Sequence, residues 1–281
     1  MTDVETVVAA ARALMYAGRW ELGAQLLAST GRDHPDLLLA AAELAVYRDF
    51  WCGTRTAPAA LAAAADPRHE WEVELLALQH DYFSAIIGPD GAPRIGPDRH
   101  DPAAVAALAD RAERVHATGP VGVRRGWAAF WRGVIADNLA GEPGAARPLY
   151  AEAQAAAEAD GDDPLAAEAL RHLGGHARRE GDHAEARRLW ERSTRLKQGA
   201  GLVPWTLSQQ LALAQNAADT GDTARAAAIA AEVGRWAEAL ALARLAAAAR
   251  DLLAQYQGSW TGSAGTRPAA SSAASGPSPI G

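Results

Sequence analysis

The feature that most constrains the fold of this 281-residue chain is a regular recurrence of glycines. Gly141, Gly181 and Gly221 are spaced by 40 residues, and each is followed by a glutamate or an aspartate. Glycine readily adopts the left-handed conformation that ends a helix. An acidic residue directly after it caps free N–H groups of the next helix and favours the positive end of its dipole. The spacing therefore predicts consecutive hairpins of two α-helices.

The composition also favours helices. Apolar residues make up 49% of the sequence, yet the mean hydropathy is only −0.14, because much of that fraction is alanine. Alanine has the highest helix propensity, and alanine-rich stretches interrupted by Arg and Glu are typical of packed amphipathic helices. The sequence has no alternating apolar runs joined by Asn-Gly or Asp-Gly turns, which would indicate β-hairpins. We therefore expect an all-α fold.

One unit of the repeat carries a known pattern: a Leu-Gly pair, a Gly-Asp turn, and a small residue followed by a bulky aromatic one. These positions are Leu173-Gly174 within 169–174, Gly181-Asp182, Ala186, Trp190 and Ser193. The pattern resembles the tetratricopeptide repeat (TPR), over about residues 119–257. The aromatic position holds Tyr150 in the unit before and Ala230 in the unit after, the 40-residue period is longer than usual for the family, and the family's terminal proline is missing. The resemblance implies a TPR-like α-solenoid, a right-handed superhelix of about six antiparallel helix hairpins with a C-terminal capping helix.

We expect a single repeat domain over residues 1–257. Residues 1–118 contain diverged hairpins, with helices expected at 4–17, 20–29, 35–50, 58–65, 68–87 and 102–117. Residues 119–234 contain the regular hairpins, and residues 235–257 are expected to form the capping helix. The Gly- and Pro-rich segment 88–101 predicts either a functional loop or a tolerated surface insertion. Residues 258–281 are mainly Gly, Ser, Ala and Pro, and we expect them to be disordered.

Charge and hydropathy narrow the classes of function. No stretch approaches the roughly 18 consecutive apolar residues of a membrane span, and the acidic N-terminus lacks the basic region of a signal peptide. The sole cysteine, Cys52, has no internal disulfide partner, so we expect a cytoplasmic protein. The net charge of −7 argues against a nucleic-acid partner. Neither a phosphate-binding loop nor a serine nucleophile elbow occurs, and we expect no cofactor.

Three residues share one face of a predicted helix: Glu168, His172 and His176 are spaced by four. Two histidines at this spacing can chelate a metal ion, and a carboxylate can supply a third ligand. The alternative is that the histidines pack and hydrogen-bond between hairpins. The glutamate of a His-Glu-x-x-His motif is missing here. We therefore predict no metal site, and we keep His172 and His176 as candidate ligand-binding residues.

Aromatic residues form a second pattern. Trp127 and Trp131 are one turn apart on a helix that the resemblance places on the concave face of the superhelix, and Tyr82 ends another such helix. A row of rings there would hold a peptide or a flat apolar ligand. The alternative is that these rings only fill the space that alanines leave. Nine tryptophans are many for this length, however, and tryptophans are rarely all fully buried.

Charged residues indicate two further roles. His80, Asp137 and His172 would form an acid–base group around one concave pocket if the helices stack in order, whereas ordinary polarity at helix ends is the alternative. Arg171 and Arg178 are the arginines expected on the inner face, where they would bind a carboxylate or a phosphate. Alternatively, they belong to a solvated basic surface that is paired with nearby glutamates.

These patterns predict a binding protein whose concave groove holds a peptide, a partner protein or a small apolar or anionic molecule. The Ala- and Arg-rich composition is typical of a high-GC bacterial genome, in which such a protein would be a regulator or an accessory factor of a pathway. The alternative is a small-molecule enzyme with acid–base or cyclase-like chemistry in a Trp- and His-lined pocket closed by the 88–101 loop. An open groove along several units would favour the first, and one enclosed pocket would favour the second. Surfaces at the N-terminal end would also allow a homodimer.

Overall fold

The computed structural model describes residues 3–30, 34–88 and 92–261, with side chains up to residue 256. These residues form thirteen α-helices and no β-strand, so the predicted all-α class is confirmed. A π-helical turn, η3 (Ala136–Ala140), extends α7, and two short 3-10 turns are η1 (Pro67–His69) and η2 (Pro97–Arg99). The helices are α1 (Val4–Tyr16), α2 (Trp20–Ser29), α3 (Pro35–Cys52), α4 (Ala57–Ala63), α5 (Glu70–Ile86), α6 (Pro102–Thr118), α7 (Val123–Ile135), α8 (Pro143–Asp160), α9 (Asp163–Arg179), α10 (His183–Gly199), α11 (Val203–Asp219), α12 (Thr223–Ala239) and α13 (Ala243–Thr261).

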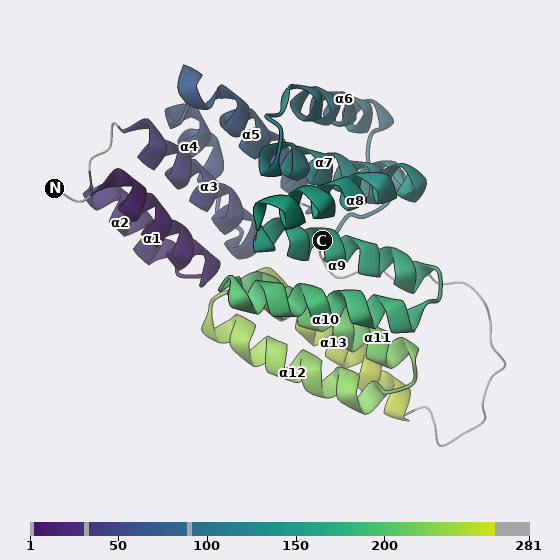
Figure 1. The fold of residues 1–281 in the computed structure, drawn as a ribbon. Helices are drawn as coiled ribbons and strands as arrows, with labels where there is room; N and C mark the ends of the chain where they lie inside the picture. The colour runs from purple at the N-terminus through teal and green to yellow at the C-terminus, as the bar shows by residue number, and fades with distance from the viewer. Residues whose placement is uncertain (1–2, 31–33, 89–91, 262–281) are drawn as a thin grey trace.

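Successive helices pack against one another in a stack that curves back on itself (Figure 1). The C-terminal helices α11 and α13 return to the N-terminal helices α1 and α3. Pro204 of α11 packs against Gly18, α13 lies against α3, and Arg244 donates a hydrogen bond to the carbonyl oxygen of Phe50. These contacts close the curve, so the inner face is bounded by helices from both halves of the chain.

The turns in the C-terminal half follow a 20-residue spacing, which is half the period seen in the sequence. The backbone φ is positive at Gly161, Gly181, Gly201, Gly221 and Ala241. Helices α8 to α12 all end with the same backbone hydrogen bond. The N–H of the residue that follows the positive-φ residue donates to a carbonyl oxygen in the last turn of the helix. The predicted left-handed glycines at 141, 181 and 221 are therefore confirmed.

The acidic residues after these glycines cap the next helix in two of three turns. Asp182 accepts a hydrogen bond from the N–H of Glu185 at 2.9 Å, and Asp222 accepts one from Arg225 at 3.1 Å. The capping prediction is wrong at Glu142, whose side chain makes no such bond. Glutamate is not among the preferred N-cap residues, which have short side chains that reach the N–H groups of the first turn.

The end of the chain differs from the expectation. The stretch 235–257, predicted as one capping helix, is divided, because α12 continues to Ala239 and α13 begins at Ala243. Ala241 has a φ of 56° at the break and takes the left-handed place that glycine holds in the earlier turns. Helix α13 extends to Thr261, so residues 258–261 are helical rather than part of a disordered tail. The rest of that predicted tail lies outside the described residues.

The described part of the 88–101 segment packs onto the end of α7. The N–H of Gly96 donates to the carbonyl oxygen of Asn138 at 2.8 Å, and Pro97 packs against Gly141. Pro93 forms an isolated bridge with Ile87. Residues 92–101 are thus held against the π-helical turn.

Complementary side-chain sizes set the spacing within the regular hairpins. A Cβ atom added at Gly133 would lie 2.9 Å from the ring of Tyr150, and one added at Gly174 would lie 2.4 Å from the indole of Trp190. Each glycine therefore lets a large ring of the second helix approach the backbone of the first. On α11 and α12 the equivalent positions hold Ala214 and Ala230, and both of these alanines are fully buried.

Candidate functional site

Aromatic rings fill the inner face of the curved stack. Trp205 of α11 lies edge-on to Tyr47 of α3, with ring centroids 5.0 Å apart. Phe83 of α5 stacks on Phe50 at 4.1 Å and meets the ring of Trp131 at 5.4 Å. Offset and edge-to-face pairs of this kind attract one another beyond the area they bury. The rings therefore hold four helices that are distant in sequence around one centre.

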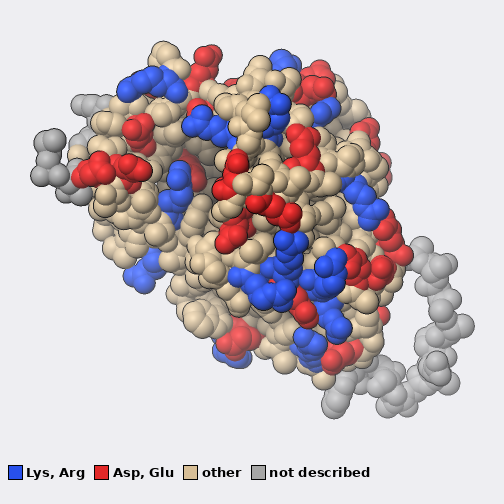
Figure 2. Space-filling model, viewed as in Figure 1, with Lys and Arg blue, Asp and Glu red and all other residues tan. Residues whose placement is uncertain are grey.

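Two adjoining cavities lie among these rings. We call the smaller one the inner chamber; it has a volume of about 30 Å³, which is room for a water molecule, and it is bounded by α3, α5, α7, α9, α10 and α11. We call the other one the vestibule; it has a volume of about 330 Å³ and extends to α1. The surface in Figure 2 is hollowed where the N-terminal helices face α7 and α9. The two cavities share Tyr47, Trp127, Trp131, Trp205 and Glu168.

One side of the inner chamber is charged. The Nζ atom of Lys197 lies 2.6 Å from Oε1 of Glu168, and the Lys197 side chain is 1% exposed. Arg171 donates hydrogen bonds to Gln209 at 3.3 Å and to Ser208 at 3.2 Å. Burial, partly opposed by Glu168, lowers the pKa of Lys197 to about 8. Burial alone would raise the pKa of Glu168, but Lys197 and Arg171 outweigh it, so this pKa lies below its ordinary value.

His172 presents a neutral ring to the same chamber. It stacks on Tyr150 with centroids 4.8 Å apart and meets Phe130 at 5.3 Å. Burial lowers the pKa of His172 to about 3, so the ring is uncharged at neutral pH. Its Nε2 atom is buried and has no hydrogen-bond partner among the described residues. A neutral imidazole nitrogen can donate or accept one hydrogen bond, so His172 Nε2 is available to a polar group that enters the chamber.

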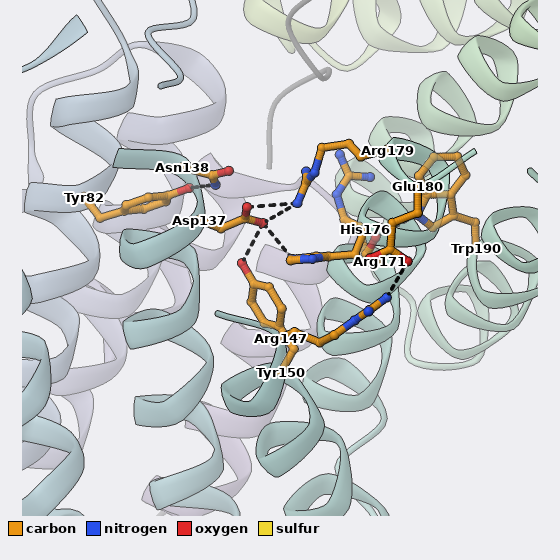
Figure 3. A network of polar contacts seen from close by, with 10 residues as sticks. All are labelled: Tyr82, Asp137, Asn138, Arg147, Tyr150, Arg171, His176, Arg179, Glu180 and Trp190. Carbon is orange, nitrogen blue, oxygen red and sulfur yellow. Dashed lines mark hydrogen bonds and ion pairs between the residues drawn. The ribbon is translucent and has the colours of Figure 1, made fainter. Parts of the chain in front are cut away.

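Asp137 is the centre of a separate polar network at the hydroxyl end of Tyr150 (Figure 3). It lies in the π-helical turn and accepts two hydrogen bonds from Arg179, at 2.9 and 3.0 Å, and one from the Tyr150 hydroxyl at 3.4 Å. His176 Nε2 lies 3.1 Å from its Oδ2 atom. Burial raises the pKa of Asp137, but the hydrogen bond with His176 and the charge of Arg179 outweigh it and hold this pKa at about 2. The carboxylate is saturated with partners, and this network joins the π-helical turn η3 to α8 and α9.

The predicted site residues fall into three groups. Tyr82, Trp127, Trp131, Arg171 and His172 line the inner chamber. The second group, Asp137 and His176, belongs to the network just described. The third group, His80 and Arg178, lies elsewhere: His80 pairs with Asp81 at 3.4 Å and lines a third cavity of about 580 Å³, while Arg178 pairs with Asp219 at 2.5 Å. The structure thus brings His172 to the inner chamber without His80.

The three residues of the stripe Glu168, His172 and His176 lie on one helix, as expected, but have different partners. Glu168 pairs with Lys197, His176 pairs with Asp137, and His172 stacks on Tyr150. Among the described residues, no group of three His, Cys, Asp or Glu side chains is arranged to hold a metal ion. The basic residues of α10 are mixed with acidic ones on the surface (Figure 2), as in the pairs Arg188–Glu185 and Arg192–Glu158.

Two important residues of the chamber escaped the sequence analysis. Lys197 follows Trp190 by seven residues, on the stripe of α10 that faces α9, and this spacing could have revealed its burial. Trp205 is placed by the return of α11 to α1 and α3, which no local pattern indicates.

No family model and no curated protein matches this chain. Across the described residues, no helix combines the length and the apolar character needed to cross a membrane.

Proposed function

We propose that this chain is a TPR-like binding protein, a right-handed superhelix of about six hairpins that holds a small flat molecule at its centre. The observation that carries the proposal is the convergence of rings from α3, α5, α7 and α11 on two adjoining cavities. A peptide, a partner protein and a small molecule were all expected ligands. We favour the small molecule because the contacts of α11 and α13 with α1 and α3 close the inner face.

The vestibule suits the apolar body of such a ligand. Its volume of about 330 Å³ is within the range of small-molecule sites, and Trp127, Trp131 and Trp205 supply flat walls. Arg171 and Lys197 stand at the far side of the inner chamber, where they would attract a polar or anionic end of the molecule. A ligand with a flat body and one polar end therefore fits both cavities.

Binding is preferred over acid–base catalysis. The enzyme alternative needs His80, Asp137 and His172 around one pocket. His80 lines a different cavity, and Asp137 is saturated by Arg179, Tyr150 and His176. A binding protein of this kind would be a regulator or an accessory factor in its pathway.

The test compares two tryptophan substitutions. Trp127 is partly buried at the boundary of the two cavities, whereas Trp236 on α12 is half exposed. Titration of the protein with 2-naphthol, followed by tryptophan fluorescence and calorimetry, should give saturable binding in the wild type and in Trp236→Ala. Trp127→Ala should weaken it at least tenfold, since stacked and apolar contacts of a flat ring are lost. Equal affinity in the two variants, or no binding to the wild type, would refute the proposal.

A further inference from the structure

The sequence has 26 arginines but a single lysine, Lys197. This lysine lines the inner chamber, and its side chain is 1% exposed. Arginine stays protonated in proteins and presents a fork of donors, whereas lysine loses its proton readily when it is buried. A buried, unprotonated lysine amine attacks carbonyl carbons. The single amine side chain of the sequence thus lies next to the proposed ligand space.

The groups around Lys197 are suited to proton transfer. Glu168 on α9 lies 2.6 Å from the amine, and Arg171 and His172 face the chamber from the same helix. Tyr47 of α3 and Tyr82 of α5 are the other titratable groups that line it. Burial lowers the pKa of Lys197 to about 8, so roughly a fifth of the amine is unprotonated near pH 7.4.

The two cavities differ in size, so they would hold different parts of a ligand. The vestibule has room for a flat ring system, and the inner chamber has room for little more than one small group. Glu168 lines both cavities and Lys197 lines only the inner chamber, so a short group that extends from the vestibule toward Lys197 would meet this carboxylate.

We propose that Lys197 forms a reversible imine with the aldehyde or ketone group of a flat ligand whose body lies in the vestibule. Glu168 first accepts a proton from the ammonium group. The amine nitrogen then forms a bond to the carbonyl carbon as the carbonyl π bond breaks, and a proton moves from this nitrogen to the carbonyl oxygen, which becomes a hydroxyl. Glu168 returns its proton to this hydroxyl, which leaves as one water molecule, and the C=N double bond remains. No oxidant, reductant or further reactant takes part. This inference rests on the proposed binding function.

The experiment incubates the whole protein with 2-naphthaldehyde, stops the reaction with borohydride, and measures the intact mass. Reduction converts an imine into a stable secondary amine, so one adduct is expected on the wild type. Peptide mapping should place it on Lys197 and not on the α-amino group. Lys197→Met and Lys197→Arg should both lack the adduct. Near-ultraviolet circular dichroism, which reports the packing of the tryptophan rings, shows whether the chamber remains formed in both variants.

The pH dependence gives a second readout. The initial rate of adduct formation should rise about 50-fold from pH 6 to pH 8 and level off above about pH 9, because the amine titrates near pH 8. An ordinary exposed amine would keep gaining rate through pH 10.

The outcomes separate the two proposals. Saturable 2-naphthol binding without an adduct on Lys197 would overturn the imine and leave the binding function standing. An adduct that persists in Lys197→Met, or that maps to the α-amino group alone, would also overturn it. Failure of both probes to bind would refute the binding function and the imine together.

Discussion

Two adjacent glycines of α9 provide a sharp test of how the hairpins are packed. Gly174 faces α10, and a Cβ atom added there would lie 2.4 Å and 2.5 Å from two atoms of the Trp190 indole. The neighbouring Gly175 faces away, and a Cβ atom there would meet only the end of Arg179 at 3.9 Å. The same substitution, glycine to alanine, should therefore have opposite effects at the two positions.

Three effects determine how much Gly174→Ala changes the free energy of unfolding. Trp190 is 3% exposed and would have to move by about 1 Å to reach ordinary contact distance, and overpacking of this kind costs about 1–3 kcal/mol. The movement also disturbs the hydrogen bond that its Nε1 donates to the carbonyl oxygen of Arg171 at 2.7 Å, which is worth about 1 kcal/mol. The better helix propensity of alanine returns about 1 kcal/mol. We expect Gly174→Ala to lower the free energy of unfolding by about 1–3 kcal/mol.

At Gly175 an added Cβ atom meets no close neighbour, so only the better helix propensity of alanine matters. Gly175→Ala should therefore raise the free energy of unfolding by about 0.5–1 kcal/mol. Urea unfolding followed by far-ultraviolet circular dichroism measures both changes, and an unchanged denaturant slope shows that the comparison is valid. If Gly174→Ala is as stable as the wild type, the close approach of Trp190 to the α9 backbone is refuted. Equal destabilisation of both variants would show instead that α9 does not tolerate alanine on either face.

Three further predictions concern single features of the fold. Ala241→Gly should stabilise the protein by about 1 kcal/mol in thermal unfolding, because alanine is strained at a φ of 56°; a loss of stability would contradict the left-handed turn. Glu168→Gln should cost about 3–5 kcal/mol, since it leaves Lys197 buried without its carboxylate, whereas Glu168→Gln with Lys197→Met should recover most of this loss. Asp137→Asn should lower the free energy of unfolding by about 1–3 kcal/mol at pH 7. Because the pKa of Asp137 is lowered to about 2, its contribution is present above pH 4 and lost as the pH falls toward 2, so the two proteins should converge in acid.

Local signals predicted the turns well and the closure of the stack poorly. Gly181 and Asp182 form their turn through contacts within a few residues, so the sequence pattern alone could identify it. The contact of Arg244 with Phe50 joins residues 194 positions apart, and no pattern within a few residues indicates such a contact. Ala241 shows that a turn can also form where the sequence carries no glycine to indicate it. Packing of α12 against α13 imposes the left-handed conformation there.

The candidate site depended on this closure, and that explains which of its residues could be foreseen. Trp127 and Trp131 were predicted because the TPR resemblance places their helix on the inner face, and His172 was predicted from its spacing to Glu168 and His176. His80 was grouped with His172 on the assumption that the helices stack in order, but it lines a separate cavity, which Phe83 also lines. Trp205 was missed because its ring meets Tyr47 only after the curve has closed.

The closure also links the fold to the chemistry of Lys197. An open groove would leave this amine in water, where its pKa stays near 10.5 and arginine would serve equally well as a surface cation. Trp205 and Tyr47, brought together from α11 and α3, line the chamber and bury the Lys197 side chain together with its other walls. The same rings that wall the ligand space thus remove the solvation of the amine and lower its pKa, while Glu168 limits the effect. A buried ion pair of this kind adds little stability compared with apolar packing, so its presence at this position is better explained by what it can bind than by what it holds together.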